Sequence, residues 1–299
     1  MSLLIFAMPG YDQLADRLAE LLAGDRGAVE TRHFPDGESY ARLMDDVSGR
    51  DVIFVASLDR PDGKILPLLF AASTARELGA KTVGLVVPYL PYMRQDRRFH
   101  EGEAITSRWF AKLVSSFADW MVTIDPHLHR HHSLDEIYDM EAHSLQAAPL
   151  ISAWISDKVE KPLLVGPDME SEQWVSAVAE SVNAPFTILE KNRKGDRDVE
   201  VSRPDVSAWQ DHTPILVDDI ISTARTMIET IGRIEEVGLQ PPICIGVHAV
   251  FAEQGYETLK EASPADIVTC NTIAHETNVI EVADLLADGI RDRVSMLKL

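Results

Sequence analysis

Two adjacent carboxylates, Asp218 and Asp219, follow a short apolar run and precede three hydroxyl side chains: Ser222, Thr223 and Thr226. The run 215–217 has the composition of a strand buried on both faces in a parallel sheet. Acids at the carboxyl end of such a strand lie where open α/β sheets bind ligands, and they suit ribose hydroxyls. The hydroxyls and the amides of the next helix suit a phosphate. The pattern predicts a sugar-phosphate site, and a strand–turn–helix with a solvated acidic turn is the other interpretation.

Cations are scarce in this chain, whose formal net charge is -20. Such a charge opposes non-specific binding to nucleic acid, which needs a positive field. A phosphate-binding protein of this composition must gather its cations locally. Two clusters satisfy that condition, and they consist of Arg94, Arg97 and Arg98, and of Lys191, Arg193, Lys194 and Arg197.

Two loops have residues that suit a nucleotide. In 34–38 the ring of Phe34 stands beside Asp36 and Glu38, so it could stack a base and touch its sugar; an ordinary turn is the alternative. The stretch 88–97 contains two prolines, which make it stiff and non-helical. A stiff loop is suited to presenting Arg94 and Gln95 to a ligand, although a charged surface loop has the same composition.

Two further strand ends have metal-binding side chains. Asp125-Pro126-His127 follows an apolar run, and its carboxylate and imidazole could bind or orient a Mg²⁺–nucleotide, although Mg²⁺ prefers oxygen ligands. Gly166-Pro167-Asp168 again places an acid after an apolar run. Three more histidines lack a matching second pair of zinc ligands, so we expect surface side chains at His129, His131 and His132.

The elements that position these residues alternate between strand and helix. We expect strands at 2–8, 51–57, 81–87, 120–124, 163–165, 185–189, 214–217, 243–250 and 267–270. We expect helices at 11–23, 65–78, 106–117, 145–155, 171–182, 226–237, 256–261 and 279–287. This alternation predicts an α/β fold of two doubly wound parallel-sheet domains. We place them at 1–145 and 146–299, with the last helix returning to the first domain.

Bulk composition narrows the class of protein. No apolar run is long enough to span a bilayer, and the first residues lack a basic leader, which predicts a cytoplasmic protein without a membrane partner. Cys244 and Cys270 lie in apolar runs, where buried free thiols are expected.

These motifs together resemble the phosphoribosyl-pyrophosphate (PRPP) synthetase family, the ribose-phosphate pyrophosphokinases, and most closely its short archaeal-type members. The stretch 214–227 is similar to the family's PRPP loop, shared with type I phosphoribosyltransferases, and implies ribose 5-phosphate binding by Asp218, Asp219, Ser222, Thr223, Ala224, Arg225 and Thr226. The loops 34–38 and 88–97 resemble its ATP-binding segments and imply Phe34, Asp36, Glu38, Arg94, Gln95 and Asp96.

The resemblance also implies metal binding by His127 and Asp168, and a flexible loop whose Lys191 and Arg193 stabilise the transferring group. Self-association is implied too, as a dimer or larger, since the family's 34–38 loop reaches a neighbouring subunit. Two loops depart from the family: Ala224-Arg225 replaces a pair of glycines, and Glu170-Ser171 stands in a loop where the family has glycine. Such glycines let backbone amides approach a phosphate closely.

The implied reaction is Mg²⁺-dependent transfer of the diphosphoryl group of ATP to the C1 hydroxyl of ribose 5-phosphate, which gives PRPP and AMP. One alternative is a catalytically silent homologue that binds nucleotide and regulates an active partner. Another is a phosphoribosyltransferase, which shares the 214–227 loop but leaves Arg94-Gln95 and the Lys191-x-Arg193 pair unexplained.

Overall fold

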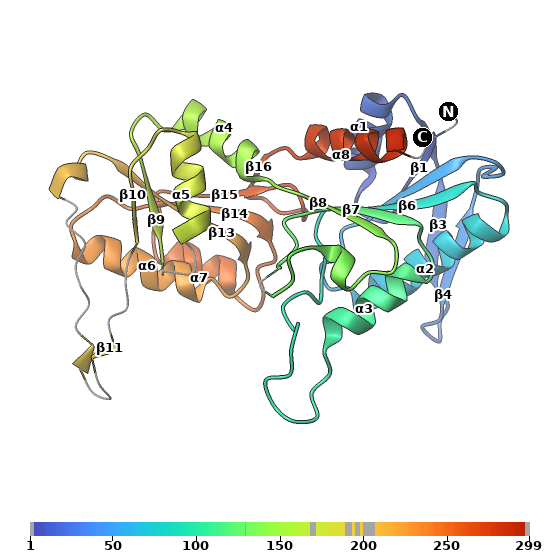
Figure 1. Ribbon diagram of the computed structural model, residues 1–299, viewed down its shortest axis with the longest axis horizontal. Coiled ribbons are helices and arrows are strands. Elements are labelled where there is room, and N and C mark those ends of the chain that lie inside the picture. The colour runs from blue at the N-terminus through green and yellow to red at the C-terminus, as the bar shows by residue number, and fades with distance from the viewer. Residues whose placement is uncertain are drawn as a thin grey trace. The chain divides into compact units, whose positions relative to one another are not determined.

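The computed structural model of this protein describes residues 3–128, 130–167, 172–188, 193–194, 198–199 and 207–296. The chain forms two compact units (Figure 1). The first comprises Met1–Gln146 together with Val282–Leu299, and the second comprises Ala147–Glu281. The last helix of the chain therefore belongs to the first unit.

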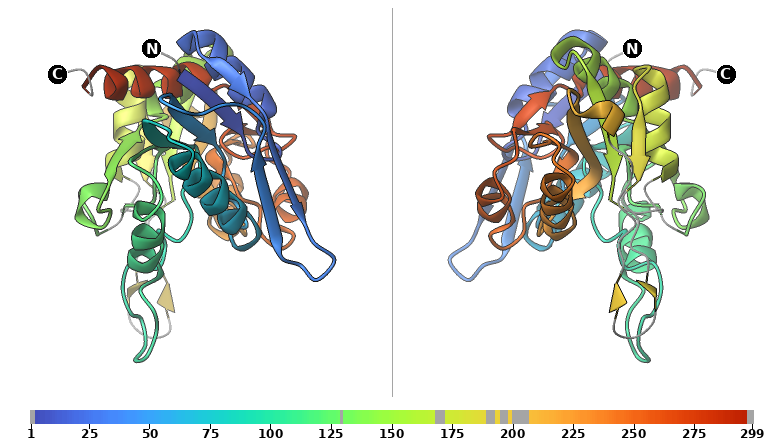
Figure 2. Two further views of the ribbon diagram at one scale, coloured as in Figure 1. Left: turned by 90° about the vertical axis from the view of Figure 1, so that its right-hand side faces the viewer. Right: turned by 90° about the vertical axis from the view of Figure 1, so that its left-hand side faces the viewer.

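The first unit is built on a six-stranded parallel sheet in the order β2-β1-β5-β6-β7-β8. Its strands are β1 (Leu3–Ala7), β2 (Asp25–Gly27), β5 (Asp51–Val55), β6 (Thr82–Val87), β7 (Trp120–Ile124) and β8 (Glu141–Leu145). Its helices are α1 (Asp12–Leu22), α2 (Asp62–Glu77), α3 (Thr106–Ser115) and α8 (Ala283–Met296), with a 3-10 turn, η1, at Leu134–Glu136. An antiparallel hairpin of β3 (Val29–His33) and β4 (Ser39–Leu43) projects from this unit as a two-stranded arm (Figure 2, left, blue).

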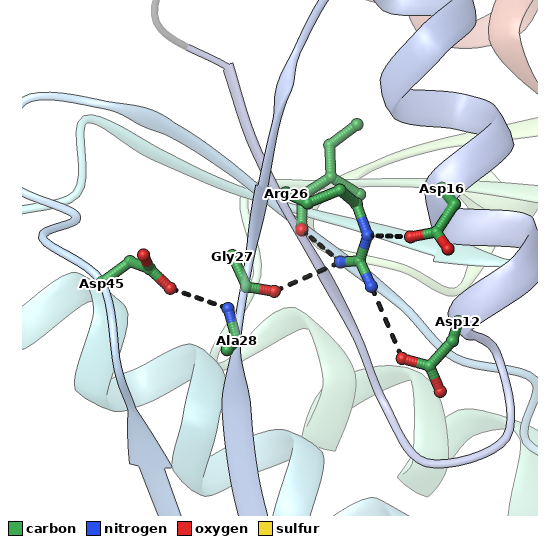
Figure 3. A network of polar contacts seen from close by, with 7 residues as sticks. Asp12, Asp16, Arg26, Gly27, Ala28 and Asp45 are labelled. Atoms are coloured by element: carbon green, nitrogen blue, oxygen red, sulfur yellow. Dashed lines mark hydrogen bonds and ion pairs between the residues drawn. The ribbon is translucent and has the colours of Figure 1, made fainter.

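Helices cover both faces of this sheet: α1 and α8 lie together on one side, and α2 and α3 lie on the other (Figure 1). The central strands β5 and β7 are buried along their whole length, as expected for apolar strands covered on both faces. The short edge strand β2 is secured by Arg26, whose guanidinium donates to Asp16 Oδ1 at 2.6 Å and to the Ile5 carbonyl at 2.7 Å (Figure 3). Arg26 thereby ties β2 to both α1 and β1.

The second unit repeats this plan with a sheet in the order β10-β9-β13-β14-β15-β16. Its strands are β9 (Pro162–Gly166), β10 (Phe186–Ile188), β13 (Thr213–Ile221), β14 (Ile243–Ala249), β15 (Asp266–Cys270) and β16 (Asn278–Ile280). Its helices are α4 (Ala148–Lys158), α5 (Glu172–Ser181), α6 (Arg225–Glu236) and α7 (Gly255–Glu261), with a 3-10 turn, η3, at Ser207–Trp209. A short antiparallel pair, β11 (Arg193–Lys194) and β12 (Asp198–Val199), is also present.

The two sheets have the same internal order, and each unit places an antiparallel hairpin between its second and third sheet strands. Thus β1 corresponds to β9 and β5 to β13. Helix α4 contacts α5 in the second unit, as α8 contacts α1 in the first. The fold is the two-domain, doubly wound α/β arrangement that the alternation predicts.

Several predicted elements have different bounds, and three of them have a clear local cause. Strand β13 continues through Asp218 and Asp219 to Ile221, because two further apolar residues pair with β14. The helix expected at 145–155 begins at Ala148, since Leu145 ends β8. The helix expected at 279–287 begins at Ala283, and 278–280 form the edge strand β16, where the side-chain amide of Asn278 (Nδ2) donates to the Cys270 carbonyl at 3.0 Å.

Both cysteines are buried free thiols, as predicted, and burial raises the pKa of the Cys244 thiol to about 12. Among the described residues, every helix is too short or too polar to span a membrane.

Candidate functional site

The segment that follows β6 is held in place by a buried acid. Asp96 has a side chain only 3% exposed, and Arg130 Nη1 donates to both of its carboxylate oxygens, at 2.7 and 2.9 Å. Arg130 lies on the segment after β7, so the pair joins the two loops at the carboxyl edge of the first sheet. Of the predicted ATP-binding side chains here, Arg94 is exposed, Gln95 is half-buried and Asp96 faces inward.

The same segment is stiffened at two more points. Tyr92 has a φ of 63° and its hydroxyl donates to Asp62 at the start of α2; this bond raises the Tyr92 pKa to about 12. Gln95 Oε1 accepts a hydrogen bond from Thr106 Oγ1, at the start of α3, at 3.4 Å. The loop therefore presents the Arg94 guanidinium to solvent from a backbone anchored on two helices.

The loop after β7 contains the predicted metal ligand His127, which is half-buried. The Ile124 amide donates to the Pro88 carbonyl at 3.3 Å, so this strand end lies beside the beginning of the Arg94 loop. Asp125 has a φ of 34°, which turns the chain sharply as it leaves the strand. Within the described residues no three His, Cys, Asp or Glu side chains converge on one point, so His127 alone would need phosphate oxygens and water to complete a Mg²⁺ shell.

The prediction of a surface side chain at His131 is wrong. Its side chain is 13% exposed, and its Nδ1 lies 2.9 Å from Glu136 Oε2, which also lowers the pKa of that carboxyl. His132 is exposed as expected, and its amide donates to Glu136 Oε1. Glu136, on η1, therefore organises the turn beyond Arg130. His129 lies outside the described residues.

The predicted base-stacking loop is the turn of the β3–β4 hairpin. The Phe34 amide donates to the Glu38 carbonyl at 2.8 Å, Asp36 Oδ1 accepts from the Glu38 amide, and Gly37 has a φ of 92°. This φ is one that glycine adopts at little cost, which explains its place in the turn. Phe34 is 39% exposed, and the Arg32 guanidinium lies 4.6 Å from its ring centroid. Phe34, Asp36 and Glu38 thus lie at the exposed tip of the arm.

The predicted sugar-phosphate loop lies at the carboxyl edge of the second sheet. β13 pairs with β9 only as far as Leu216, so Asp218 and Asp219 extend past the end of β9 and are half-buried. The Asp218 carboxylate accepts a hydrogen bond from the Asp219 amide at 2.9 Å. Gly246, opposite Asp218 on β14, leaves room for Ile221, because a Cβ there would be 2.6 Å from the Ile221 side chain.

The departure at Ala224 has a backbone consequence. Ala224 caps α6 with a φ of 57°, a left-handed conformation that favours glycine, and it is buried. The glycine-type backbone is therefore retained at this position although the side chain is not glycine. Arg225 and Thr226 are exposed on the first turn of α6, while Ser222 and Thr223 are half-buried before it.

A second loop, which motif analysis missed, supports this one from behind. The Phe251 and Ala252 amides donate to the carbonyls of Ile221 and Ser222 at 2.8 and 3.2 Å. A Cβ on Gly255 would lie 2.2 Å from the Ser222 carbonyl oxygen, so only glycine fits there. His275 packs on Phe251 and Tyr256 at centroid distances of 4.5 and 4.8 Å, and burial lowers its pKa. The Gly255 position has no local sequence signal, because its constraint comes from Ser222.

Two predicted residues, Lys191 and Asp168, lie outside the described residues. Arg193 begins β11, whose pairing with β12 places Arg193 opposite Val199. Asp218 lies near the end of β13, and Asp168 follows β9 in the sequence; these neighbouring strands flank the point where the strand order of the second sheet reverses. Open α/β sheets bind ligands at such a reversal.

Comparison with known proteins defines the class. Residues 3–117 match the N-terminal domain of ribose phosphate pyrophosphokinase, and residues 133–285 match a phosphoribosyl transferase domain. The chain is 32% identical to the ribose-phosphate pyrophosphokinase of Sulfurisphaera tokodaii over 273 residues, which cover 90% of this chain and 93% of that protein. It is 31% identical to the Methanobrevibacter smithii protein of the same name over 291 residues, covering 93% and 97%.

A crystal structure of phosphoribosylpyrophosphate synthetase from Mycobacterium smegmatis is similar over 99% of both chains, with a TM-score of 0.85 and 25% identity. Fold and relatives thus define a two-domain protein of the phosphoribosyltransferase type. This chain belongs to the ribose-phosphate pyrophosphokinase family.

Proposed function

We propose that this protein is a ribose-phosphate diphosphokinase, which converts ATP and ribose 5-phosphate into PRPP and AMP. One observation carries the proposal beyond family membership. Each of two sheets of the same order places one predicted substrate loop beyond its central strands: Arg94 follows β6, and Asp218 to Thr226 span the end of β13 and the start of α6. The chain thus has one predicted ligand-binding edge for each of its two anionic substrates.

The reaction is an in-line transfer. The C1 hydroxyl oxygen of ribose 5-phosphate attacks the β-phosphorus of ATP, the bond from that phosphorus to the oxygen bridging to the α-phosphate breaks, and AMP leaves while the hydroxyl proton passes to solvent. Such transfers depend on positioning and charge neutralisation more than on covalent catalysis. In this proposal Lys191 and Arg193 neutralise the transferring phosphates, and Arg94 and Gln95 hold the nucleotide.

The ribose and its phosphate are assigned to the second unit. Asp218 and Asp219 accept hydrogen bonds from ribose hydroxyls, and their half-burial beyond the end of β9 supports this role. Ser222, Thr223 and Thr226, with the amides of Ala224 and Arg225, bind the 5-phosphate at the amino terminus of α6, which favours negative charge.

Mg²⁺ is the proposed metal, with His127 and Asp168 as its protein ligands. It would neutralise phosphate charge when bound. The oxygen-rich triphosphate suits Mg²⁺ better than the imidazole does, so the nucleotide would supply most of its ligands. We further assign Phe34, Asp36, Glu38 and Asp96 to the ATP site, with the arm serving a neighbouring subunit of a dimer or larger assembly. The buried free thiols are suited to the reducing cytoplasm.

The test is AMP release from Mg²⁺-ATP that depends on ribose 5-phosphate, with PRPP measured as the second product. Equal amounts of AMP and PRPP support the proposal, and no turnover at high protein concentration contradicts it. The left-handed Ala224, in place of the usual glycine, favours one second candidate, a silent homologue. Calorimetry separates the two, because a silent form binds ATP and ignores ribose 5-phosphate.

A further inference from the structure

A cavity of about 280 Å³ lies within the first unit, and none of the predicted site residues lines it, although its lining residue Arg32 contacts the ring of Phe34. Its walls come from the end of β1, from β3, from the residues after β5 and from the first turns of α2, and they comprise Met8, Pro9, Tyr11, Thr31, Arg32, His33, Ala56, Ser57, Gly63, Lys64 and Pro67. β1 and β5 are neighbours in the sheet, and β2 and β6 extend from them in opposite directions. The cavity therefore lies at the point where the strand order reverses, where open α/β sheets bind ligands.

The correspondence between the two sheets relates this cavity to a predicted ligand site in the second unit. Strands β1 and β5 are the counterparts of β9 and β13, and the sugar-phosphate loop is predicted after β13. The predicted nucleotide residues of the first unit lie elsewhere: Phe34, Asp36 and Glu38 in the turn between β3 and β4, and Arg94, Gln95 and Asp96 after β6. The first unit thus has an open position equivalent to the predicted ribose 5-phosphate position, and none of the three predicted substrate loops, 34–38, 88–97 and 214–227, contributes a residue to it.

The lining is unusual for so acidic a chain. The protein has 48 acidic residues and 28 lysines and arginines, yet none of the lining residues is acidic. Lys64 Nζ is oriented by Asp59 Oδ1 at 2.6 Å and by the Ser57 carbonyl at 3.2 Å. Arg32 is held over the rings of Phe34 and Tyr40 at 4.6 and 4.3 Å. Two positioned cations therefore line the space, and each is ion-paired with an acid, Asp59 or Glu30, that is not among the lining residues.

Another part of the wall is apolar, while Thr31, His33 and Ser57 add polar groups. Met8, Pro9, Ala56 and Pro67 form the apolar part together with the ring of Tyr11, whose hydroxyl donates to Asp59 at 3.1 Å. Burial is the main cause that raises the Tyr11 pKa, so this hydroxyl stays protonated. Small-ligand pockets span roughly 300–1,000 Å³, so the space suits a compact molecule with one flat apolar part and one anionic group.

From these features we propose that the cavity binds a nucleoside monophosphate, with its base against the apolar wall and its phosphate between Lys64 and Arg32. This inference goes beyond the proposed reaction and does not depend on it, because every lining residue belongs to the first unit.

Binding of labelled AMP to the full-length chain, without ATP or metal, tests the inference by equilibrium dialysis. Gly63 lines the cavity and has no atom within 4 Å of where a Cβ would lie, so Gly63→Leu adds bulk at the cavity wall without a clash at Cβ. Gly232→Leu on α6 is the matched control, because its Cβ position is equally open. Arg94→Ala removes the nucleotide contact of the predicted ATP site. We expect one class of AMP site that Gly63→Leu abolishes and that Gly232→Leu and Arg94→Ala retain.

Lys64→Met provides a second variant should Gly63→Leu not fold. Losing a hydrogen bond to a charged group weakens binding roughly 10- to 100-fold, so we expect a change of that size in this class of site. AMP binding that Gly63→Leu and Lys64→Met leave unchanged would overturn the inference, as would inorganic phosphate binding as tightly as AMP. If the wild-type protein releases no AMP from ATP and ribose 5-phosphate, the proposed function is contradicted, but the AMP-binding result at the cavity is unaffected.

Discussion

Arg130 Nη1 contacts both carboxylate oxygens of Asp96, at 2.7 and 2.9 Å, across 34 positions of sequence. The acid is buried, while the arginine is 44% exposed. This pair connects the loop that presents Arg94 to the loop that contains His127. The position of two predicted substrate-binding side chains therefore depends on one partly solvated ion pair.

Replacing Arg130 with glutamine should destabilise the protein by about 1–3 kcal/mol, because it leaves a buried carboxylate without its cation and the exposure of Arg130 reduces the full cost. We also expect a several-fold rise in the KM for ATP. Urea denaturation and initial rates measure both. Arg76→Gln, which removes the more exposed pair with Asp119, should cost less than about 1 kcal/mol. The double variant Asp96→Asn/Arg130→Gln should be more stable than Arg130→Gln alone; if it is less stable, the buried charge is not the cause.

Removing the predicted catalytic cations should lower kcat far more than substrate affinity. A group that stabilises transition-state charge contributes about 10²–10³ in kcat, so Lys191→Ala and Arg193→Ala should each lose about that much in AMP formation. Lys194→Ala is the neighbouring control, since the Lys-x-Arg spacing leaves Lys194 out. An equal loss in Lys194→Ala would mean that general positive charge matters and that the spacing does not.

Ala224→Gly should stabilise the protein and strengthen ribose 5-phosphate binding. The left-handed φ of 57° costs a residue with a Cβ about 1–2 kcal/mol, and glycine's extra entropy loss offsets about half of this. Thermal denaturation should show a gain of about 0.5–1 kcal/mol. Ala23→Gly, at the end of α1 with a φ of 50°, should give a similar gain without changing the KM for ribose 5-phosphate. A higher KM in Ala224→Gly would contradict this view of the loop.

His275 should make stability depend on pH. Burial lowers its pKa below 6.5, and the nearby Glu276 and Glu257 oppose the shift only in part. Between 6.5 and the lower folded value, the unfolded chain binds more protons, so stability falls as the pH decreases through that window and levels off below it. Protonation also conflicts with the Thr277 amide, which donates to His275 Nδ1 at 3.3 Å.

Urea denaturation of the wild type and of His275→Gln, at about pH 8 and about pH 5, measures this dependence. The variant should lose less stability on acidification than the wild type. His132→Gln, at an exposed position, serves as the control. Parallel pH profiles for wild type and His275→Gln would exclude the imidazole as the source.

Central strands were the part of the fold that sequence predicted best. Asp51–Val55, Thr82–Val87 and Trp120–Ile124 lie within two residues of their predicted bounds, because strands buried on both faces appear as continuous apolar runs. The edge strands β2, β8 and β16 were missed. They are short and contain polar side chains, so their pairing depends on the neighbouring strand more than on local composition.

The site motifs could be found in the sequence because each is a contiguous run at a strand end. The residues that hold these motifs in place could not be found in this way. Gly255 is required by the carbonyl of Ser222, 33 positions earlier, and Arg130 by Asp96. Such pairings between distant segments leave no periodic signal. The acids were predicted to follow their strand, whereas β13 includes them, because Ile220 and Ile221 pair with β14 beyond the charged pair.

The position of α8 at the end of the chain determines the order in which the two units can complete their folding. Arg293 of this helix is 5% exposed and contacts Glu141 Oε2 at 2.6 Å, and a Cβ on Gly289 would meet the Leu145 side chain at 2.8 Å. During synthesis, residues 147–281 leave the ribosome before this helix does, so the second unit can complete its packing while the first still exposes the surface that α8 will cover. Truncation near residue 282 should therefore leave the second unit, residues 147–281, folded and should destabilise the first unit, which then lacks α8.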